Sequence, residues 1–372
     1  MTNNYKTVIC KSSENEEWDS FVASVPGTYF GQTTGWAEVN KTMGWNTWRF
    51  YLKDDREILA GAQIAFKEYP LIGRVGLIDQ GPYLRNDDAE LLKEYILQLK
   101  SFLRKNRFLL VGVTIPYFND YYIIELKKSG LVKNPFEIPP TVVVQATLII
   151  DLKKSKDELW ADVNPGRRRN IKKGLKQKFV FREGTRKELK TFHDLLLMMC
   201  ERRKSTPTHN DVEFFYRLWD NMAPQGWFKL FLLEYESKPV CALVGFTVGD
   251  TFRYWKWGWS GEYPELNFSS VLIWKTIDWA KNSGFSKFDF MQVDHSIAKI
   301  IKEGKELPQN LKEHSFSGPT QFKVRFGGDI VTTQVYLLFR NEITKTVFQY
   351  IITPLTKKRW FYKLLQVVKR KV

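Results

Sequence analysis

The stretch WFKLFLLEYESKPVCALVGFTVGDTFRYWKW, residues 227–257, decides the fold class. Three apolar runs rich in β-branched and aromatic residues alternate with turn-forming segments at 235–239 and 249–250. Runs of this composition predict strands, and a two-residue Gly-Asp connection is typical of a hairpin. The stretch therefore predicts a meander of three antiparallel strands.

The residues on both sides extend this pattern. Asn267 and Ser270 can cap a helix that runs to about Asn282, Gly284 can end it, and 285–290 is a further apolar run that predicts a strand. The first half of the chain has the same order of elements. Its expected elements are strands at 48–52, 58–66 and 75–78, a helix from a cap at 86–88 to about 105, and a strand at 108–113. One order in two halves predicts a duplicated α+β (mixed α/β) domain.

Length and composition agree with two domains. A chain of 372 residues exceeds one typical core. The Pro139-Pro140 pair marks the expected boundary, so we place the first domain at 1–145 and the second at 146–329. We expect 330–372 to pack back on the first domain.

The charge and cysteine content bound the function. Lys and Arg number 57 against 41 Asp and Glu, a net charge of +16, which favours nucleic acid, anionic lipid or a phosphorylated substrate as partner. The three cysteines are odd in number and far apart, so neither a disulfide framework nor a zinc site is indicated. No signal peptide or membrane-spanning apolar run is recognisable. The sequence predicts a cytoplasmic protein, with peripheral contact at the inner face of a membrane as an option.

The most basic segment is PGRRRNIKKGLKQKF, residues 165–179. Ile171, Leu175 and Phe179 recur at helical spacing and predict a packed stripe, while basic residues line another face. A solvated helix face and a phosphate-binding face are both open interpretations. The candidate phosphate-binding residues are Arg167, Arg168, Arg169, Lys172, Lys173 and Lys176.

The last thirty residues combine apolar, aromatic and basic side chains. No acid follows Glu342, and seven Lys or Arg residues follow Thr356. Such an amphipathic end is a candidate for contact with anionic membranes. Helix packing with a basic tail is the alternative.

Residues 321–328, QFKVRFGG, alternate apolar and basic side chains and predict a strand that ends in two glycines. A polar loop, roughly 292–320, precedes them, and loops on a rigid scaffold often carry binding groups. An ordinary strand with a solvated Lys323 is the alternative.

The available chemistry is narrow. No phosphate loop, Gly-x-Ser-x-Gly elbow or His-Glu-x-x-His motif occurs, and the four histidines are scattered. Carboxylates, tyrosines and cations remain. They suit the transfer of an activated acyl group to an amine, which needs alignment, a route for the amine proton and a cation or donor for the oxyanion.

At this point the chain resembles the Fem-type peptidoglycan interpeptide-bridge aminoacyltransferases, which have tandem GNAT-like folds. The ordered pieces are WAEVNK (36–41) with GW (44–45), QGP (80–82), DL (151–152) with LW (159–160), RRNIKK (168–173), ERRK (201–204), W-x-x-I-x-x-A-x-x-x-G (274–284), FDF (288–290) and FKVRFGG (322–328). They span most of the chain. The resemblance implies two tandem GNAT-like acyltransferase domains at the boundaries given above.

The resemblance also implies a reaction. The enzyme would move an amino acid from aminoacyl-tRNA to the side-chain amine of a stem peptide, in cell wall biogenesis and the maintenance of cell shape. The acceptor would be a UDP-muramyl-pentapeptide or a lipid-linked precursor. No cofactor would be needed, and the basic 167–176 segment would serve the tRNA.

Family roles carry over to individual positions. Lys323 would be the catalytic cation, with Phe322 beside it. The diphosphate contacts of the family fall on Arg203, with Arg202 as a near alternative, and on Lys41, although the usual spacing lands on Asn40. The remaining expected substrate-binding residues are Tyr254, Asp79 and Tyr83. Residues 290–292 replace a glycine pair of the family, which leaves the acceptor open.

Two other functions remain open. A CoA-dependent GNAT-type N-acyltransferase would use acetyl-CoA or another acyl-CoA on a polysaccharide or sugar-nucleotide precursor. The Arg/Gln-x-x-Gly-x-Gly/Ala loop that would cradle the CoA pyrophosphate does not occur in the sequence. A basic RNA- or membrane-binding protein on a GNAT scaffold is the non-enzymatic alternative.

Overall fold

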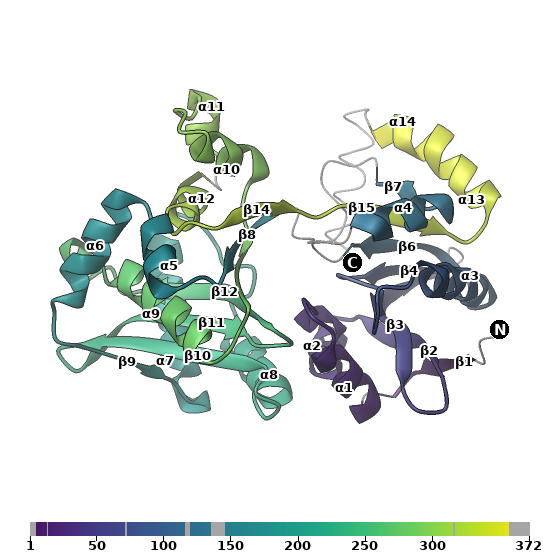
Figure 1. Ribbon diagram of the computed structural model, residues 1–372, viewed down its shortest axis with the longest axis horizontal. Helices are drawn as coiled ribbons and strands as arrows, with labels where there is room; N and C mark the ends of the chain where they lie inside the picture. Colours follow the sequence, from purple (N-terminus) through teal and green to yellow (C-terminus); the bar gives the residue numbers. More distant parts are fainter. Residues whose placement is uncertain are drawn as a thin grey trace. The chain divides into compact units, whose positions relative to one another are not determined.

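The protein has two sheets, each mixed and each flanked by helices (Figure 1). The computed structural model describes residues 5–12, 14–70, 73–115, 120–134, 146–314 and 317–356. The chain divides into unit 1, residues 1–21, 40–143 and 334–372, and unit 2, residues 22–39 and 144–333. The α+β class expected from the sequence is confirmed. The expected boundary at Pro139-Pro140 lies outside the described residues.

Unit 1 contains a sheet in the order β1-β2-β3-β4-β6-β15-β7, with β5 paired to β3. All pairs are antiparallel except β4 with β6, which α3 connects. The apolar side of α3 packs in the core with Phe50 and Phe108. The bounds are β1 Lys6–Cys10, β2 Asn46–Lys53, β3 Ile58–Tyr69, β4 Gly73–Ile78, β5 Tyr83–Leu84, α3 Ala89–Lys105, β6 Phe108–Thr114, α4 Asp120–Lys128, β7 Val132–Lys133, β15 Val335–Phe339, α13 Glu342–Val347, the π-helical η4 Phe348–Ile352 and α14 Thr353–Thr356.

Unit 2 contains a sheet in the order β14-β8-β13-β12-β11-β10-β9, and only β12 with β13 is parallel. The meander expected from the sequence is β10-β11-β12, and α9 connects β12 to β13. The bounds are β8 Ala146–Asp151, α5 Lys156–Asp162, α6 Pro165–Leu175, β9 Phe179–Glu183, η2 Arg186–Glu188, α7 Leu189–Arg202, α8 Val212–Met222, β10 Phe228–Tyr235, β11 Lys238–Phe246, β12 Thr251–Trp259, η3 Pro264–Leu266, α9 Phe268–Asn282, β13 Lys287–Gln292, α10 His295–Lys302, α11 Gln309–Lys312, α12 Ser317–Val324 and β14 Asp329–Thr332.

An early segment of the chain belongs to unit 2. The short helix η1, Phe30–Gln32, is buried there, and Phe30 stacks on Phe246 with ring centroids 3.7 Å apart. Gly27 donates its N–H to Asp250 at 2.8 Å and accepts from Arg253 at 2.9 Å. Two further helices, α1 Glu16–Ser24 and α2 Thr34–Thr42, lie at the ends of this segment.

The prediction of a strand at 321–328 was wrong, because the first half of this stretch, 321–324, belongs to the helix α12, which packs against α10, and the rest forms a turn. Ser317, Thr320 and Val324 are buried at helical spacing, and the rings of Phe322 and Phe326 contact each other at 5.5 Å. The apolar and basic residues that alternate in this sequence therefore lie on different sides of a helix and not on the two faces of a strand. Gly327 and Gly328, both at φ +88°, turn the chain into β14.

Candidate active site

The two parallel strands of unit 2 separate near their middle. Residues 251–253 of β12 pair with residues 287–289 of β13, and the ladder stops there. Just beyond it, Met291 has φ +54°, and the register of β13 against β8 shifts between Asp289 and Gln292. The strands therefore diverge after Asp289.

Lys323 of α12 reaches this point of divergence. Its Nζ donates to the carbonyl oxygens of Phe290, at 2.9 Å, and Gln292, at 2.7 Å. The ammonium also lies 5.3 Å from the ring centroid of Tyr254 on β12. Burial lowers the pKa of Lys323 to about 8, while the carboxylate of Asp289 acts in the opposite direction. An ammonium group has three donors, so one remains for a reacting group.

Asp289 stabilises the backbone of β13 at the point where β12 and β13 separate. Its buried carboxylate accepts the N–H of Met291 at 2.6 Å and the hydroxyl of Thr147, and Arg253 Nε lies 3.8 Å away. Burial raises the pKa of Asp289, and the charge of Arg253 opposes that rise. The bond to Met291 holds the left-handed residue at which β13 changes register.

Phe322 stacks on a side chain that the sequence did not identify. Its ring lies 5.3 Å from Trp257 with an interplanar angle of 7°. Strict alternation along β12 would place Trp257 on the side opposite Tyr254. The register between β11 and β12 shifts, because Val244 pairs with Lys256 but Gly245 pairs with Tyr254. This bulge leaves one extra residue in β12, so that Tyr254 and Trp257 both pack in the core of unit 2. A single sequence does not reveal such a bulge.

Arg167, named from the sequence as a candidate phosphate-binding residue, differs from the other members of that set. Its side chain turns inward: the residue is only 8% exposed, Nη1 donates to Ser270 at 2.5 Å, and the guanidinium lies 4.4 Å from the ring centroid of Phe322. Within the described residues no acidic side chain pairs with it, and its buried Nε has no partner. Burial, together with the charge of Arg325, lowers the pKa of Arg167 to about 10.

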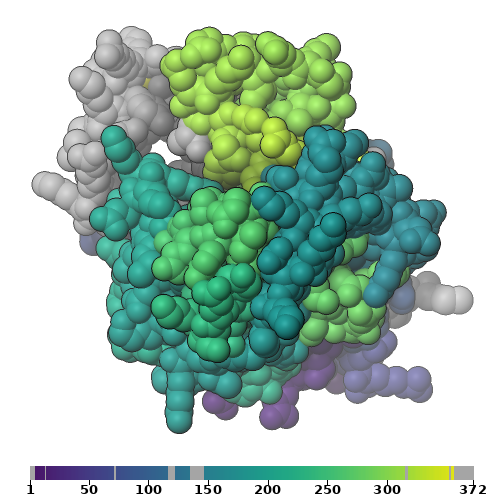
Figure 2. Space-filling view, turned by 90° about the vertical axis from the view of Figure 1, so that its left-hand side faces the viewer, coloured from purple at the N-terminus to yellow at the C-terminus, as the bar shows by residue number. Residues whose placement is uncertain are grey.

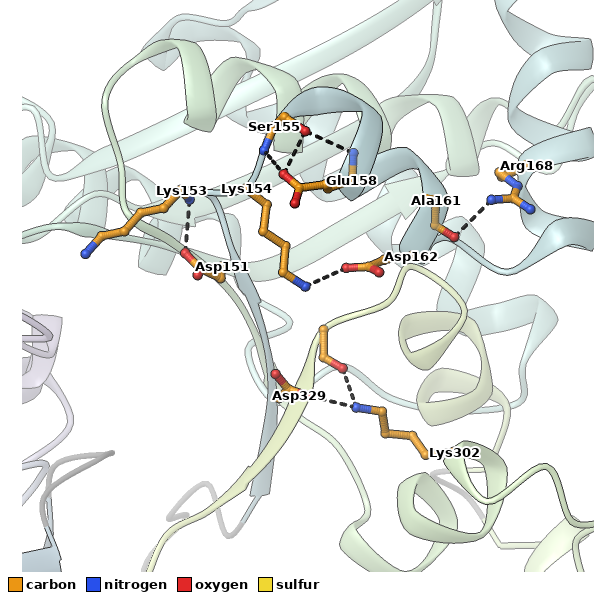
Figure 3. Close-up of polar contacts among 11 residues, drawn as sticks. Asp151, Lys153, Lys154, Ser155, Glu158, Ala161, Asp162, Arg168, Lys302 and Asp329 are labelled. Atoms are coloured by element: carbon orange, nitrogen blue, oxygen red, sulfur yellow. Dashed lines mark hydrogen bonds and ion pairs between the residues drawn. The ribbon is translucent and has the colours of Figure 1, made fainter.

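Most of the other basic residues in and just after α6 face outward. Ile171 and Gly174 are buried where α6 packs on α9, which Figure 2 shows side by side in blue-teal and green. Arg168 is half-buried, and Nη1 donates to the Ala161 carbonyl at 2.9 Å (Figure 3). The exposed basic residues are Arg169, Lys172, Lys173 and Lys176. The expected packed stripe stops at Ile171, because Leu175 is exposed and Phe179 belongs to β9.

Two ion pairs brace the turn that follows α12. Lys154 pairs with Asp162 at 2.8 Å, and Lys302 pairs with Asp329 at 3.1 Å (Figure 3). A Cβ on Gly327 would lie 2.9 Å from the Cβ of Asp162, and Asn164 donates its N–H to Arg325 at 3.0 Å. The start of α6 and the end of α12 are thus held together.

The candidate diphosphate residues at the end of α7 lie along the same aromatic surface. The guanidinium of Arg203 is 5.6 Å from the ring centroid of Trp257, and the residue is exposed. Arg202 instead donates to the carbonyls of Ser260, at 2.6 Å, and Trp259. Tyr254 is buried, and its hydroxyl has no partner among the described residues. The structure therefore brings Lys323, Phe322, Tyr254 and Arg203 together in unit 2.

The remaining candidates lie on elements of unit 1. Lys41 is exposed near the end of α2, and Asp79 is half-buried in the turn after β4. Tyr83 is buried in β5, opposite Gly61. No group of three His, Cys, Asp or Glu side chains suited to a metal ion occurs among the described residues. Within the same residues, every helix is too short or too polar to cross a bilayer.

Known proteins are similar to both halves of the chain. The FemAB family matches residues 13–121, and an acetyltransferase (GNAT) domain matches residues 166–296. The lipid II:glycine glycyltransferase of Staphylococcus haemolyticus (strain JCSC1435) is 26% identical over 239 residues, which are 61% of this chain and 55% of that protein. The matched part thus spans about half the length of this relative.

Solved structures are similar over nearly the whole chain. The crystal structure of FemX has a TM-score of 0.78 at 17% identity and covers 93% of this chain and 99% of that one. A tandem GNAT protein from the clavulanic acid biosynthesis pathway has a TM-score of 0.51 at 8% identity, with coverages of 91% and 99%. These likenesses establish the tandem GNAT-like fold.

Proposed function

Because this chain belongs to the Fem-type proteins with a tandem GNAT-like fold, we propose that it is an acyltransferase that adds an amino acid to a peptidoglycan precursor. The donor would be aminoacyl-tRNA and the acceptor the side-chain amine of a stem peptide. The reaction would form an interpeptide bridge in cell wall biogenesis and so contribute to cell shape. The observation that carries this proposal is Lys323, held with Phe322 at the divergence of β12 and β13.

The geometry suits attack of an amine on an ester. The acceptor nitrogen forms a bond to the aminoacyl carbonyl carbon, and the ester bond to the tRNA ribose breaks. The amine loses a proton, and the ribose oxygen gains one. Negative charge develops on the carbonyl oxygen in between, and the third donor of Lys323 would stabilise it. The hydroxyl of Tyr254, which has no partner among the described residues, would bind the substrate beside this group.

Other features support the identity of the substrates. The exposed basic side of α6 suits the phosphates of a tRNA, with Arg169, Lys172, Lys173 and Lys176 as contacts. Arg203 would bind the diphosphate of the precursor, and Lys41 remains the other candidate that the resemblance names. The name of the staphylococcal relative favours a lipid-linked acceptor over a soluble UDP-muramyl-pentapeptide. A cytoplasmic location at the inner face of the membrane belongs to the same proposal.

A CoA-dependent N-acyltransferase is the second candidate. The match to an acetyltransferase (GNAT) domain over residues 166–296 favours it. Its acceptor would be a polysaccharide or a sugar-nucleotide precursor.

One experiment separates these functions. Labelled amino acids on a charged tRNA pool are supplied with either a lipid-linked precursor or a UDP-muramyl-pentapeptide, in parallel with labelled acetyl-CoA. We expect label to enter a precursor from tRNA alone. Label from acetyl-CoA alone would establish the second candidate, and no label from either donor would favour a non-enzymatic binding protein.

A further inference from the structure

The helix that follows β15 presents its apolar side to solvent. The elements α13, η4 and α14 succeed one another without a break over residues 342–356, in yellow in Figure 1. Ile343 and Tyr350 are each 75% exposed, Ile351 is 53% exposed and Val347 is 42% exposed. These four residues, here called the 343–351 stripe, follow one another at intervals of four, three and one residues, which at the helical repeat places them on one side of the helix.

The charged residues of the helix do not belong to that side. Between Ile343 and Ile351 the remaining exposed residue is Thr346, which is uncharged. Lys345 is half-buried and pairs with Glu342 at 3.0 Å. Phe348 packs toward the unit, with its ring 5.0 Å from that of Phe339. Beyond Glu342 in its first turn, this helix therefore exposes its large apolar residues and not charged ones.

Helix α3 of the same unit shows the ordinary arrangement. It buries Leu92, Ile96 and Leu99, and most of its exposed residues are polar or charged. Its single large exposed apolar residue is Leu97, at 53%. Isolated apolar residues of this kind are normal on a protein surface, whereas a contiguous stripe marks a contact surface.

The charge of the adjoining sequence identifies the partner. No acid follows Glu342, and the sixteen residues after Thr356 contain seven Lys or Arg residues together with Trp360 and Phe361. An apolar stripe continued by cations and aromatic residues suits an anionic bilayer, where the apolar groups enter the interface and the cations meet the headgroups. A second copy of this chain would bring like charges together.

We infer that the 343–351 stripe is a membrane-docking surface that binds the interface of an anionic bilayer. This inference deepens the proposed function, on which it rests for its biological meaning, because a lipid-linked acceptor lies in such an interface. Insertion of the stripe into the bilayer interface contributes to the binding free energy separately from the electrostatic attraction of the basic sequence that follows it. The stripe should therefore persist as a determinant of binding at high salt, when the attraction between charges is screened.

The test is sedimentation of the full chain with vesicles of phosphatidylcholine alone or mixed equally with phosphatidylglycerol, at low and high salt. We expect binding to the mixed vesicles, and a loss of about tenfold or more in partitioning for Ile343→Glu/Ile351→Glu at both salt concentrations. Leu97→Glu, at an apolar position of the same unit that is as exposed as Ile351, should bind as the wild type does. Circular dichroism spectra and thermal melting check that all variants fold.

Three results would overturn the inference: no binding by the wild type, equal binding by the stripe variant, or a dimer in vesicle-free buffer that the stripe variant abolishes. The last result would assign the stripe to self-association. The vesicles contain neither precursor nor tRNA, so the outcome does not depend on catalysis. Lys323→Ala should bind vesicles normally even though it loses transfer, which separates failure of the docking surface from failure of the proposed function.

Discussion

Lys323 is a charged residue whose ammonium group is desolvated and held by two backbone carbonyls. Its Nζ is held by the carbonyls of Phe290 and Gln292, and burial lowers its pKa to about 8. A cation desolvated in this way interacts more strongly with a developing oxyanion than a solvated lysine would. The same desolvation makes its charge sensitive to mildly alkaline pH.

Lys323→Ala should lower the transfer rate by about a hundredfold or more with little loss of stability. The reason is that the proposed oxyanion stabilisation disappears, whereas removal of a desolvated charge offsets the lost hydrogen bonds. Single-turnover rates and thermal melting check the two effects. An unchanged rate would remove Lys323 from the mechanism.

The titration of Lys323 can be measured without substrate. We expect a midpoint near pH 8 in ¹³C NMR of its Cε, assigned by comparison with Lys323→Arg. Because the pKa is lower in the folded state than the ordinary 10.5, the unfolded state binds more protons between about pH 8 and 10.5. This group therefore adds stability as pH rises through that window, while the catalytic cation is lost above about pH 8. A midpoint near 10.5 would contradict the assignment.

Arg167 is a candidate positioning residue for Phe322. It lies over the Phe322 ring and donates to the Phe322 carbonyl at 3.5 Å. We expect Arg167→Met to lower kcat by about tenfold with little change in KM, because misplacement of α12 affects the reaction more than binding. Stability should change little, since an apolar side chain replaces a buried charge that no acidic side chain pairs with in the described part of the chain. Lys178→Met, at an exposed basic position just after the same helix, is the control. Equal losses in both variants would refute a specific role for Arg167.

At the scale of elements, the turn between α12 and β14 determines where Lys323 lies. The two glycines at φ +88° let the chain leave the helix next to β8. A Cβ at Gly328 would be 2.6 Å from the backbone oxygen of Ile149. This close approach, and not flexibility, explains the glycine.

Gly328→Ala should destabilise the protein by about 1–3 kcal/mol, because it combines backbone strain with a contact against a fixed strand. Gly318→Ala is the matched control within α12, since a Cβ there meets nothing within 4 Å. It should be neutral or stabilise the helix by up to about 1 kcal/mol. Urea unfolding of the two variants compares them directly, and equal stability would disprove the steric argument.

At the scale of the whole molecule, each unit has its own core. The core of unit 2 includes Leu243, Phe252 and Phe288, and that of unit 1 includes Phe50 and Phe108. Residues 22–39 supply Phe30 to unit 2, where it is 2% exposed. Unit 2 is thus discontinuous in sequence.

Phe30→Ala should destabilise unit 2 by about 3–5 kcal/mol, because it leaves a cavity beside Phe246. Phe50→Ala, at a buried position of unit 1 stacked 4.9 Å from Phe102, is the counterpart. In scanning calorimetry each variant should lower a different transition. If both variants lowered one common transition, the two cores would not unfold independently.

The sequence by itself determined the fold class and the order of the strand meander, helix and strand that both halves share. Hydrophobic periodicity and turn residues act over a few neighbours, so the meander at 227–257 and the helix after Asn267 could be predicted locally. The resemblance located the Phe322-Lys323 pair. Their roles in catalysis remain predictions.

Only the tertiary structure decided how the side chains meet. Residues 321–324 became helical because burial of Ser317, Thr320 and Val324 outweighed the alternation that predicts a strand. Arg167 turned inward to Phe322, 155 residues later in the chain, and a bulge near Trp255 brought Trp257 to the same site. These outcomes depend on packing between residues that are distant in sequence. A pattern of neighbouring residues does not reveal such packing.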